Sequence, residues 1–330
     1  MKTTVANFFL GLDISKGSFH AALQMAGRSQ CMEHSFTNEA QGFKQLERWL
    51  RALGVPPKQV HACMEATSRY GEALAESLHA YLGSVSMVNP RLVKHYAKAC
   101  NLRAKSDSAD ARLLAQFCAE RHPRPWTPPL EERRMLQEMT RRLGQLRAAQ
   151  NAEYNRLESV RTEVVRRDVQ QHIAELQERL DELQEAVARH IAAHRTLREQ
   201  EQLLRSIPGI GAKTAAVLLS ELPAHLQQHY GSARQLAAHS GLTPRHHQSG
   251  KHAAPTPVCR IGSSRLRASL YMSALVGSRC QAFAAFRARL IARGKKPKQA
   301  ICALMRKLIH IVFGVLKNQQ PFNPNMLVPS

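Results

Sequence analysis

Apolar and polar positions follow two different periods along the first 120 residues. Residues 7–24 (NFFLGLDISKGSFHAALQ) hold an apolar run, a short polar turn and a second apolar run, which predicts two strands. Residues 59–67 and 83–90 predict two further strands, and residues 34–38 a short one. Apolar residues recur at helical spacing in four other segments, 39–53, 69–82, 91–100 and 106–120. Strands that alternate with helices predict a three-layer α/β domain.

The next segment, 129–202, consists almost entirely of helix-forming residues. A proline-rich stretch, 121–132, precedes it and predicts a domain boundary after residue 128. Residues 166–171 resemble a turn, so we predict an antiparallel helical hairpin. We interpret it as a coiled-coil dimerisation arm; an ordinary helical pair packed on its own domain is the alternative. The apolar residues are spaced alternately by three and four, as in a heptad seam, and are Leu136, Met139, Leu143, Leu146, Leu157, Val160, Val164, Leu176, Leu180, Leu183 and Val187.

Residues 203–330 predict a third, mainly α-helical domain. It opens with LLRSIPGIGAKTAAVLLSEL, two helices joined by Pro-Gly-Ile-Gly, which is typical of a helix-hairpin-helix. Gly209 and Gly211 permit a tight turn, whose amides and the following helix start, with Lys213, would face a phosphate. A glycine-capped turn without a ligand is the alternative.

Charged residues are distributed unevenly along the chain, and this distribution limits the classes of partner that the protein can bind. The formal net charge is +22, and residues 203–330 hold 18 Lys and Arg but a single acid, Glu221. Such a surface attracts phosphate backbones, so we expect a nucleic-acid partner. Aromatic residues make up only 5 % of the chain, which argues against base stacking as the main mode of binding.

The cysteine and hydropathy patterns indicate a cytoplasmic protein. The seven cysteines form no CxxC pair, which predicts reduced thiols and no zinc framework. We find no secretory leader and no apolar run of membrane-spanning length, and therefore expect a cytoplasmic location and no membrane partner.

Four acidic residues occupy positions where a metal-dependent enzyme needs them. Asp13 follows an apolar strand, Glu65 ends another, and Asp107 and Asp110 open a helix on one of its faces. This order of strands and helix fits a ribonuclease-H-like sheet. There, such acids converge on hard divalent cations, namely Mg²⁺, with Mn²⁺ as a substitute. Two ions about 4 Å apart can activate a nucleophile and stabilise a leaving oxygen.

A loop serine, Ser249, lies among basic residues in TPRHHQSGKH. A hydroxyl in that position is a weak nucleophile unless a base, a metal or a cationic site activates it. Arg245, His246 and Lys251 are placed to bind a phosphate. From composition alone, however, an ordinary loop serine is the favoured interpretation.

Six motifs change that interpretation. GLDISK, MEAT, KSDSADARLLA, SIPGIGAKTAAVLLSEL, SGLTPRHHQSG and LRASLYMSA occur in this order over nearly the whole chain. Together they resemble the transposase family of bacterial insertion sequences that joins a RuvC-like DEDD domain to a C-terminal serine domain. Piv-like DNA invertases and bridge-RNA-guided recombinases are similar to the same family.

The resemblance implies a mechanism and a set of partners. Asp13, Glu65, Asp107 and Asp110 would be the DEDD metal ligands, and Ser249 the nucleophile that forms a phosphoserine link to DNA. The DNA would be element ends or a circular junction together with a target. A non-coding RNA of the element would be the guide, and a dimer or tetramer would combine the RuvC-like domain of one subunit with the serine domain of another.

One motif departs from the family pattern. Relatives commonly have a Ser-Lys pair before a glycine, whereas this chain has Cys259-Arg260-Ile261-Gly262. The charge is kept, so we expect Arg260 to contact phosphate with altered geometry. Arg265 and Arg267 are further predicted contacts to the nucleic-acid backbone.

Two other functions compete with a recombinase. A RuvC-like nuclease that uses water would cut DNA with Ser249 incidental, and an architectural DNA-binding protein would not cut at all. The domains expected under the recombinase interpretation are 1–128 (RuvC-like, metal-binding), 129–202 (coiled-coil arm) and 203–330 (helix-hairpin-helix and serine domain).

Overall fold

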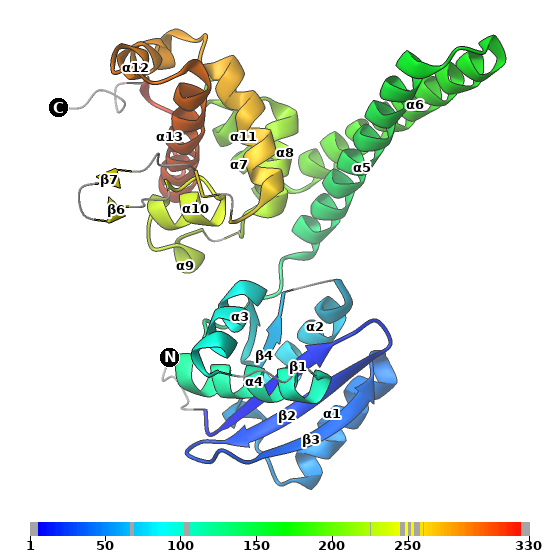
Figure 1. The fold of residues 1–330 in the computed structure, drawn as a ribbon, viewed down its shortest axis with the longest axis vertical. Helices are drawn as coiled ribbons and strands as arrows, with labels where there is room; N and C mark the ends of the chain where they lie inside the picture. Colours follow the sequence, from blue (N-terminus) through cyan, green and yellow to red (C-terminus); the bar gives the residue numbers. More distant parts are fainter. Residues whose placement is uncertain are drawn as a thin grey trace. The chain divides into compact units, whose positions relative to one another are not determined.

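A computed structural model describes the chain as two compact units, Met1–Pro128 and Pro129–Ser330 (Figure 1). Each unit is considered by itself below. The described residues are 6–66, 69–101, 106–224, 226–244, 248–249, 252–253, 258–259 and 261–324.

The N-terminal unit is built on a five-stranded mixed sheet. Its strands are β1 (Phe8–Ile14), β2 (Ser18–Met25), β3 (Cys31–Thr37), β4 (Val60–Glu65) and β5 (Val85–Val88), in the order β3-β2-β1-β4-β5. The first three strands pair antiparallel, and β1, β4 and β5 pair parallel. The described residues of this unit also form the α-helices α1 (Ala40–Ala52), α2 (Glu72–Leu82), α3 (Pro90–Ala99) and α4 (Asp107–Arg121), and the short 3₁₀ segments Pro57–Gln59 and Arg69–Gly71 precede β4 and α2.

Side-chain alternation gives each face of this sheet its own helices. Leu10 and Leu12 of β1 belong to a buried cluster with residues of α1 and α2, whereas Phe9 packs with residues of α3 and α4. The sheet is therefore covered on both faces, which is the predicted three-layer arrangement.

Helix α4 lies unusually close to β1. A Cβ atom built on Gly11 would stand 2.0 Å from the carbonyl oxygen of Ala111 and 2.3 Å from the amide nitrogen of Ala115. Only glycine permits this approach of two backbones. The N-terminus of α4 is thereby held against the strand that contains Asp13.

The C-terminal unit is mainly helical. It opens with two long helices, α5 (Glu131–Ser159) and α6 (Glu163–Ala193), which pack against each other. The predicted turn at 166–171 was wrong: these residues lie within α6, and the chain reverses at 160–162. Val164, placed in the predicted seam, is 77 % exposed. The following elements are α7 (Arg195–Arg205), α8 (Ala212–Glu221), α9 (Leu226–His229), α10 (Ala233–His239), β6 (Gln248–Ser249), β7 (His252–Ala253), α11 (Ser264–Gly277), α12 (Gln281–Ala292) and α13 (Pro297–Asn318).

The base of the long hairpin shares a hydrophobic core with the helices that follow it. Leu136 of α5 and Ile191 of α6 lie in one buried cluster with residues of α7, α8, α11 and α13. The buried guanidinium of Arg133 donates hydrogen bonds to the carbonyl oxygens of Leu219 and Leu222. The predicted boundary between residues 202 and 203 therefore falls inside one compact unit.

Helix α13 is long and apolar enough, by length and composition alone, to cross a membrane. This differs from the expectation that no apolar run reaches membrane-spanning length. Its most apolar window is 56 % buried inside this unit, against α7, α10, α11 and α12. A core helix of a folded domain accounts for this composition.

Candidate functional site

Three titratable side chains form one row across the N-terminal sheet. Asp13 of β1 pairs with His20 of β2, and the parallel register that joins Leu12 to Met64 makes Glu65 the next neighbour of Asp13. Adjacent strands lie about 4.8 Å apart. Alternation places this row on the same face as Gly11, which is the face that α4 covers.

The N-terminus of α4 adds two more carboxylates. Ser106 caps the helix, since its hydroxyl accepts a hydrogen bond from the amide of Ala109 at 3.2 Å. Asp107 and Asp110 lie in the first turn of α4, three residues apart, so their side chains are on the same face of the helix. An oxygen of Asp107 is 3.8 Å from Nε2 of His20. The close packing at Gly11 thus brings the helix start to the row of side chains on the sheet.

The carboxylates of this group influence one another. Burial raises the pKa of Asp13 above its ordinary value, and the negative charges of Asp110 and Asp107 raise it further, while His20 opposes the shift. Three like charges that interact in this way are unfavourable to one another. A bound cation would relieve that repulsion.

The donor set fits a hard divalent cation. Asp13, Glu65, Asp107 and Asp110 provide carboxylate oxygens only, which are the ligands that Mg²⁺ and Mn²⁺ prefer. Within the described part of the chain, however, no three His, Cys, Asp or Glu side chains stand close enough together to enclose an ion. Glu65 ends β4, and the strand register makes it the next neighbour of Asp13.

His20 is the residue of this group that the sequence analysis missed. The signal for it was the short turn between the first two strands. A hairpin closed at Ser15 and Ser18, whose backbone groups are hydrogen-bonded, sets His20 opposite Asp13.

Ser249 lies in a separate, two-stranded ribbon of the C-terminal unit. Its backbone is in β6 and pairs with His252 of β7. The side chain of Ser249 and all of Arg245, His246, Lys251 and Arg260 lie outside the described residues. Pro244 and Val258 pair with each other where the chain enters and leaves this segment, which we call the root of the serine segment.

Gly262 packs the end of the serine segment against the end of α10. Gly262, in the motif that departs from the family pattern, has φ +139, and a Cβ atom there would lie 2.1 Å from the carbonyl oxygen of His239. The next residue, Ser263, donates its amide to the same oxygen at 2.9 Å. Arg267 donates to the carbonyl oxygens of Ser240 and Gly262 at 3.3 and 3.4 Å. Arg267, predicted to contact nucleic acid, therefore has internal partners that a phosphate would have to displace.

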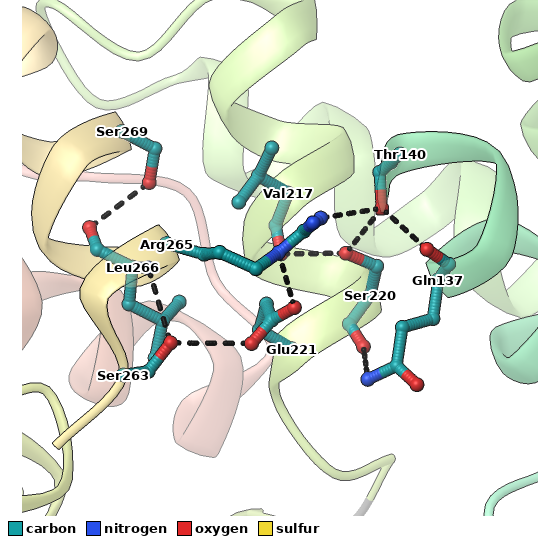
Figure 2. Close-up of polar contacts among 9 residues, drawn as sticks. All are labelled: Gln137, Thr140, Val217, Ser220, Glu221, Ser263, Arg265, Leu266 and Ser269. Atoms are coloured by element: carbon teal, nitrogen blue, oxygen red, sulfur yellow. Dashed lines mark hydrogen bonds and ion pairs between the residues drawn. The ribbon is translucent and has the colours of Figure 1, made fainter. Parts of the chain in front are cut away.

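Arg265 is also engaged inside the unit (Figure 2). Its Nε is 2.7 Å from Oε1 of Glu221, and its Nη2 donates to the hydroxyl of Thr140 at 3.1 Å. The Ser263 hydroxyl donates to the other oxygen of Glu221 at 3.2 Å. The only acid of residues 203–330 thus joins α8 to α11, and Arg265 continues this link to α5 of the long hairpin.

We expect Arg265→Met to destabilise the C-terminal unit by about 2 kcal/mol, because it leaves the mostly buried Glu221 carboxylate without its cation. Arg265 and Glu221 side chains are 31 % and 12 % exposed. Arg287→Met on the exposed face of α12 serves as a matched control. Urea unfolding of the two variants, and of Arg265→Met with Glu221→Gln, tests this; a double variant no more stable than Arg265→Met would contradict the ion pair.

The Pro-Gly-Ile-Gly turn joins α7 to α8, and its two glycines differ. Gly209 has φ +91, and a Cβ atom there would lie 2.4 Å from the carbonyl oxygen of Ser273 and 2.8 Å from the amide nitrogen of Gly277. Gly211 precedes α8 at φ −93 with open space around it. Gly209 therefore packs on α11, while Gly211 and the exposed Lys213 remain open to solvent.

Gly209→Ala is expected to cost about 3 kcal/mol of stability, through strain at positive φ and the clash with α11. Gly211→Ala, the matched control, should cost less than about 1 kcal/mol. Thermal unfolding measures both. If Gly209→Ala instead keeps its melting temperature and loses only DNA affinity, the packing role is refuted in favour of a phosphate contact.

Comparison with known proteins places both units in one group. Residues 10–166 match a family model for DEDD transposases of the IS110 type, described as "Transposase", and residues 201–290 match one described as "Transposase IS116/IS110/IS902 family". A pilin gene-inverting protein of Moraxella bovis is 32 % identical over 318 residues, which cover 96 % of this chain and 97 % of the relative. A transposase for the insertion sequence element IS1328 of Yersinia enterocolitica is 23 % identical over 93 % of this chain and 96 % of the relative.

The DEDD match confirms the RNase H-like class predicted for the N-terminal unit. Domains of that class generally depend on divalent metal ions. The match does not favour the architectural or the hydrolytic alternative. The coiled-coil arm and the helix-hairpin-helix remain predictions.

Proposed function

Because the chain belongs to the IS116/IS110/IS902 family of transposases, we propose that it cuts and rejoins DNA strands with Ser249 as nucleophile and Mg²⁺ as cofactor. Membership of this family makes the chain a DNA recombinase. The observation that supports this mechanism best is the electrostatic influence of Asp107 and Asp110 on Asp13 at one end of the sheet, where Glu65 is the next neighbour of Asp13 in register.

The acidic group would hold the metal. Asp13, Glu65, Asp107 and Asp110 are the residues we assign as ligands of one or two Mg²⁺ ions, with Mn²⁺ as a substitute. When bound, such ions neutralise charge on the scissile phosphate and stabilise the leaving oxygen. The four carboxylates would hold the ions against the phosphate, and His20, whose Nε2 lies 3.8 Å from Asp107, would attract that carboxylate when protonated.

The serine would supply the attacking oxygen. Its Oγ forms a bond to phosphorus while one P–O ester bond of the DNA backbone breaks. The hydroxyl proton passes to a base, and the departing DNA oxygen takes up a proton. The phosphodiester is replaced by a phosphoserine ester, so the strand can be rejoined to a new end by the reverse reaction without an external energy source.

Ser249 lacks a carboxylate partner in its own sequence neighbourhood, since Glu221 is the only acid of residues 203–330. Its activation must therefore come from bound cations or from basic side chains such as Arg245, His246, Lys251 and Arg260. We propose that the metal-binding domain of one subunit completes the serine site of another in a homo-oligomer, a dimer or tetramer. The arm formed by α5 and α6 is our candidate for joining subunits.

The remaining partners follow from the charge. We propose that the basic C-terminal unit binds element ends or a circular junction and target DNA. Gly211 and Lys213, at the start of α8, are our remaining candidates for contacts to the nucleic-acid backbone. A non-coding RNA of the element is the proposed guide.

Covalent trapping tests the proposal. The protein is incubated with element-junction DNA, Mg²⁺ and RNA from the same locus, and the reaction is stopped with detergent. We expect a detergent-stable protein–DNA adduct that Ser249→Ala abolishes and Asp107→Ala reduces on the order of a thousandfold. Nicked DNA without an adduct, and an active Ser249→Ala variant, would establish a water-using nuclease instead.

A further inference from the structure

A second feature of the C-terminal unit is a cavity of about 950 Å³ beside the serine segment. Its walls come from α11, α12, α13 and the residues that flank the ribbon. Among the described residues, six cationic side chains line it and no acidic one does: Arg267, Lys295, Lys296, Lys298, Arg306 and Lys307. Cations gathered without a counter-charge repel one another, so the cavity is suited to an anion.

Apolar side chains form another part of the lining. Phe286 and Leu290 of α12 and Met305 of α13 line the cavity together with Leu242 and Val258. Phosphate alone would use only the basic rim. A ligand that uses both parts of the lining has an anionic part and a flat apolar part, as a nucleotide has. The volume lies within the range of small-ligand sites and admits a single nucleotide.

A histidine, His310, is also among the residues that line the cavity. Nε2 of His310 is buried without a hydrogen bond. Burial, with the charges of Arg306, Lys307 and Arg234, lowers the pKa of His310, so the ring is neutral at neutral pH. His310 therefore adds no positive charge to the six cationic side chains that line the cavity.

The position of the cavity indicates which nucleic acid it meets. Pro244 and Val258, which pair with each other at the root of the Ser249 segment, both line it. We infer that the cavity binds an unpaired nucleotide of the DNA strand that Ser249 cuts, with its base against Phe286 and its phosphate on the lysine rim. This inference rests on the proposed function and specifies how the strand is held next to the serine.

Two cysteines provide a direct test on the full-length protein. Cys302 lines the cavity, while Cys280 is a partly exposed thiol elsewhere in the same unit. Thymidine 5′-monophosphate (dTMP) should slow alkylation of Cys302 by N-ethylmaleimide about fivefold or more and leave Cys280 unchanged, as read by mass spectrometry. Deoxyribose 5-phosphate, which lacks the base, should protect much less.

Variants sharpen this test. Lys298→Glu should raise the dTMP concentration needed for protection about tenfold, and Phe286→Ala by a similar factor. Arg293→Glu makes the same charge change on the α12–α13 connection but does not line the cavity, and should have no effect.

Several results would overturn the inference. These are equal alkylation of Cys302 with and without dTMP, equal protection by deoxyribose 5-phosphate, or tighter binding of the ribose analogue, which would indicate RNA. Failure of protection while the Ser249-dependent adduct still forms would refute the cavity and leave the proposed function standing. Protection without any such adduct would overturn the assignment to the cut strand.

Discussion

A Gly11→Ala variant is expected to lose about 3 kcal/mol of stability in the N-terminal unit and nearly all DNA cleavage. The new Cβ atom would stand 2.0 Å and 2.3 Å from backbone atoms of α4. Backbone atoms cannot relieve such an overlap by a change of rotamer, as a side chain can. The helix must move away from β1. Asp107 and Asp110 would then leave the neighbourhood of Asp13.

The measurement combines thermal unfolding with covalent trapping. Gly17→Ala is the matched control, because a Cβ atom at Gly17 meets nothing within 4 Å. Divalent cation should raise the melting temperature of wild type and of Gly17→Ala, but not of Gly11→Ala. A Gly11→Ala protein with the wild-type melting temperature would show that the close approach of α4 is not required.

Asp13→Asn is expected to lower cleavage on the order of a thousandfold without lowering stability. The carboxylate is half-buried beside two other acids, and its pKa is raised for that reason. A group whose pKa is higher in the folded state adds stability below its ordinary pKa, and that contribution is lost as pH rises through the raised value. The ionised form of Asp13 therefore lowers the stability of the folded state, and asparagine removes this effect.

Thermal unfolding with and without Mg²⁺ checks this expectation. Without the cation, Asp13→Asn should unfold at the wild-type temperature or above it at neutral pH. With the cation, only wild type and the control Glu39→Gln, an exposed acid of the same unit, should be stabilised. An Asp13→Asn protein that retains cleavage would remove Asp13 from the proposed metal site.

The local pattern of apolar and polar residues was sufficient to predict most of the helices and strands. Strand and helix positions in residues 7–120 follow from periods of two and 3.6, which depend on neighbours a few residues away. The turn of the long hairpin was predicted at the wrong residues, because a charged segment such as 166–171 is compatible with a helix as well as with a loop. The position of the actual reversal, at residues 160–162, depends on how α5 and α6 pack against each other.

By itself the sequence determined the three-layer fold of the first unit, the basic last third and four candidate ligands, because residue type and spacing are local properties. Only the tertiary structure decided that His20 joins the acidic group, that Gly209 packs on α11 and that Arg265 pairs with Glu221. Each of these facts joins segments that are not neighbours in the chain. Their pairing depends on strand register and on how closely two backbones can approach, which no local pattern encodes.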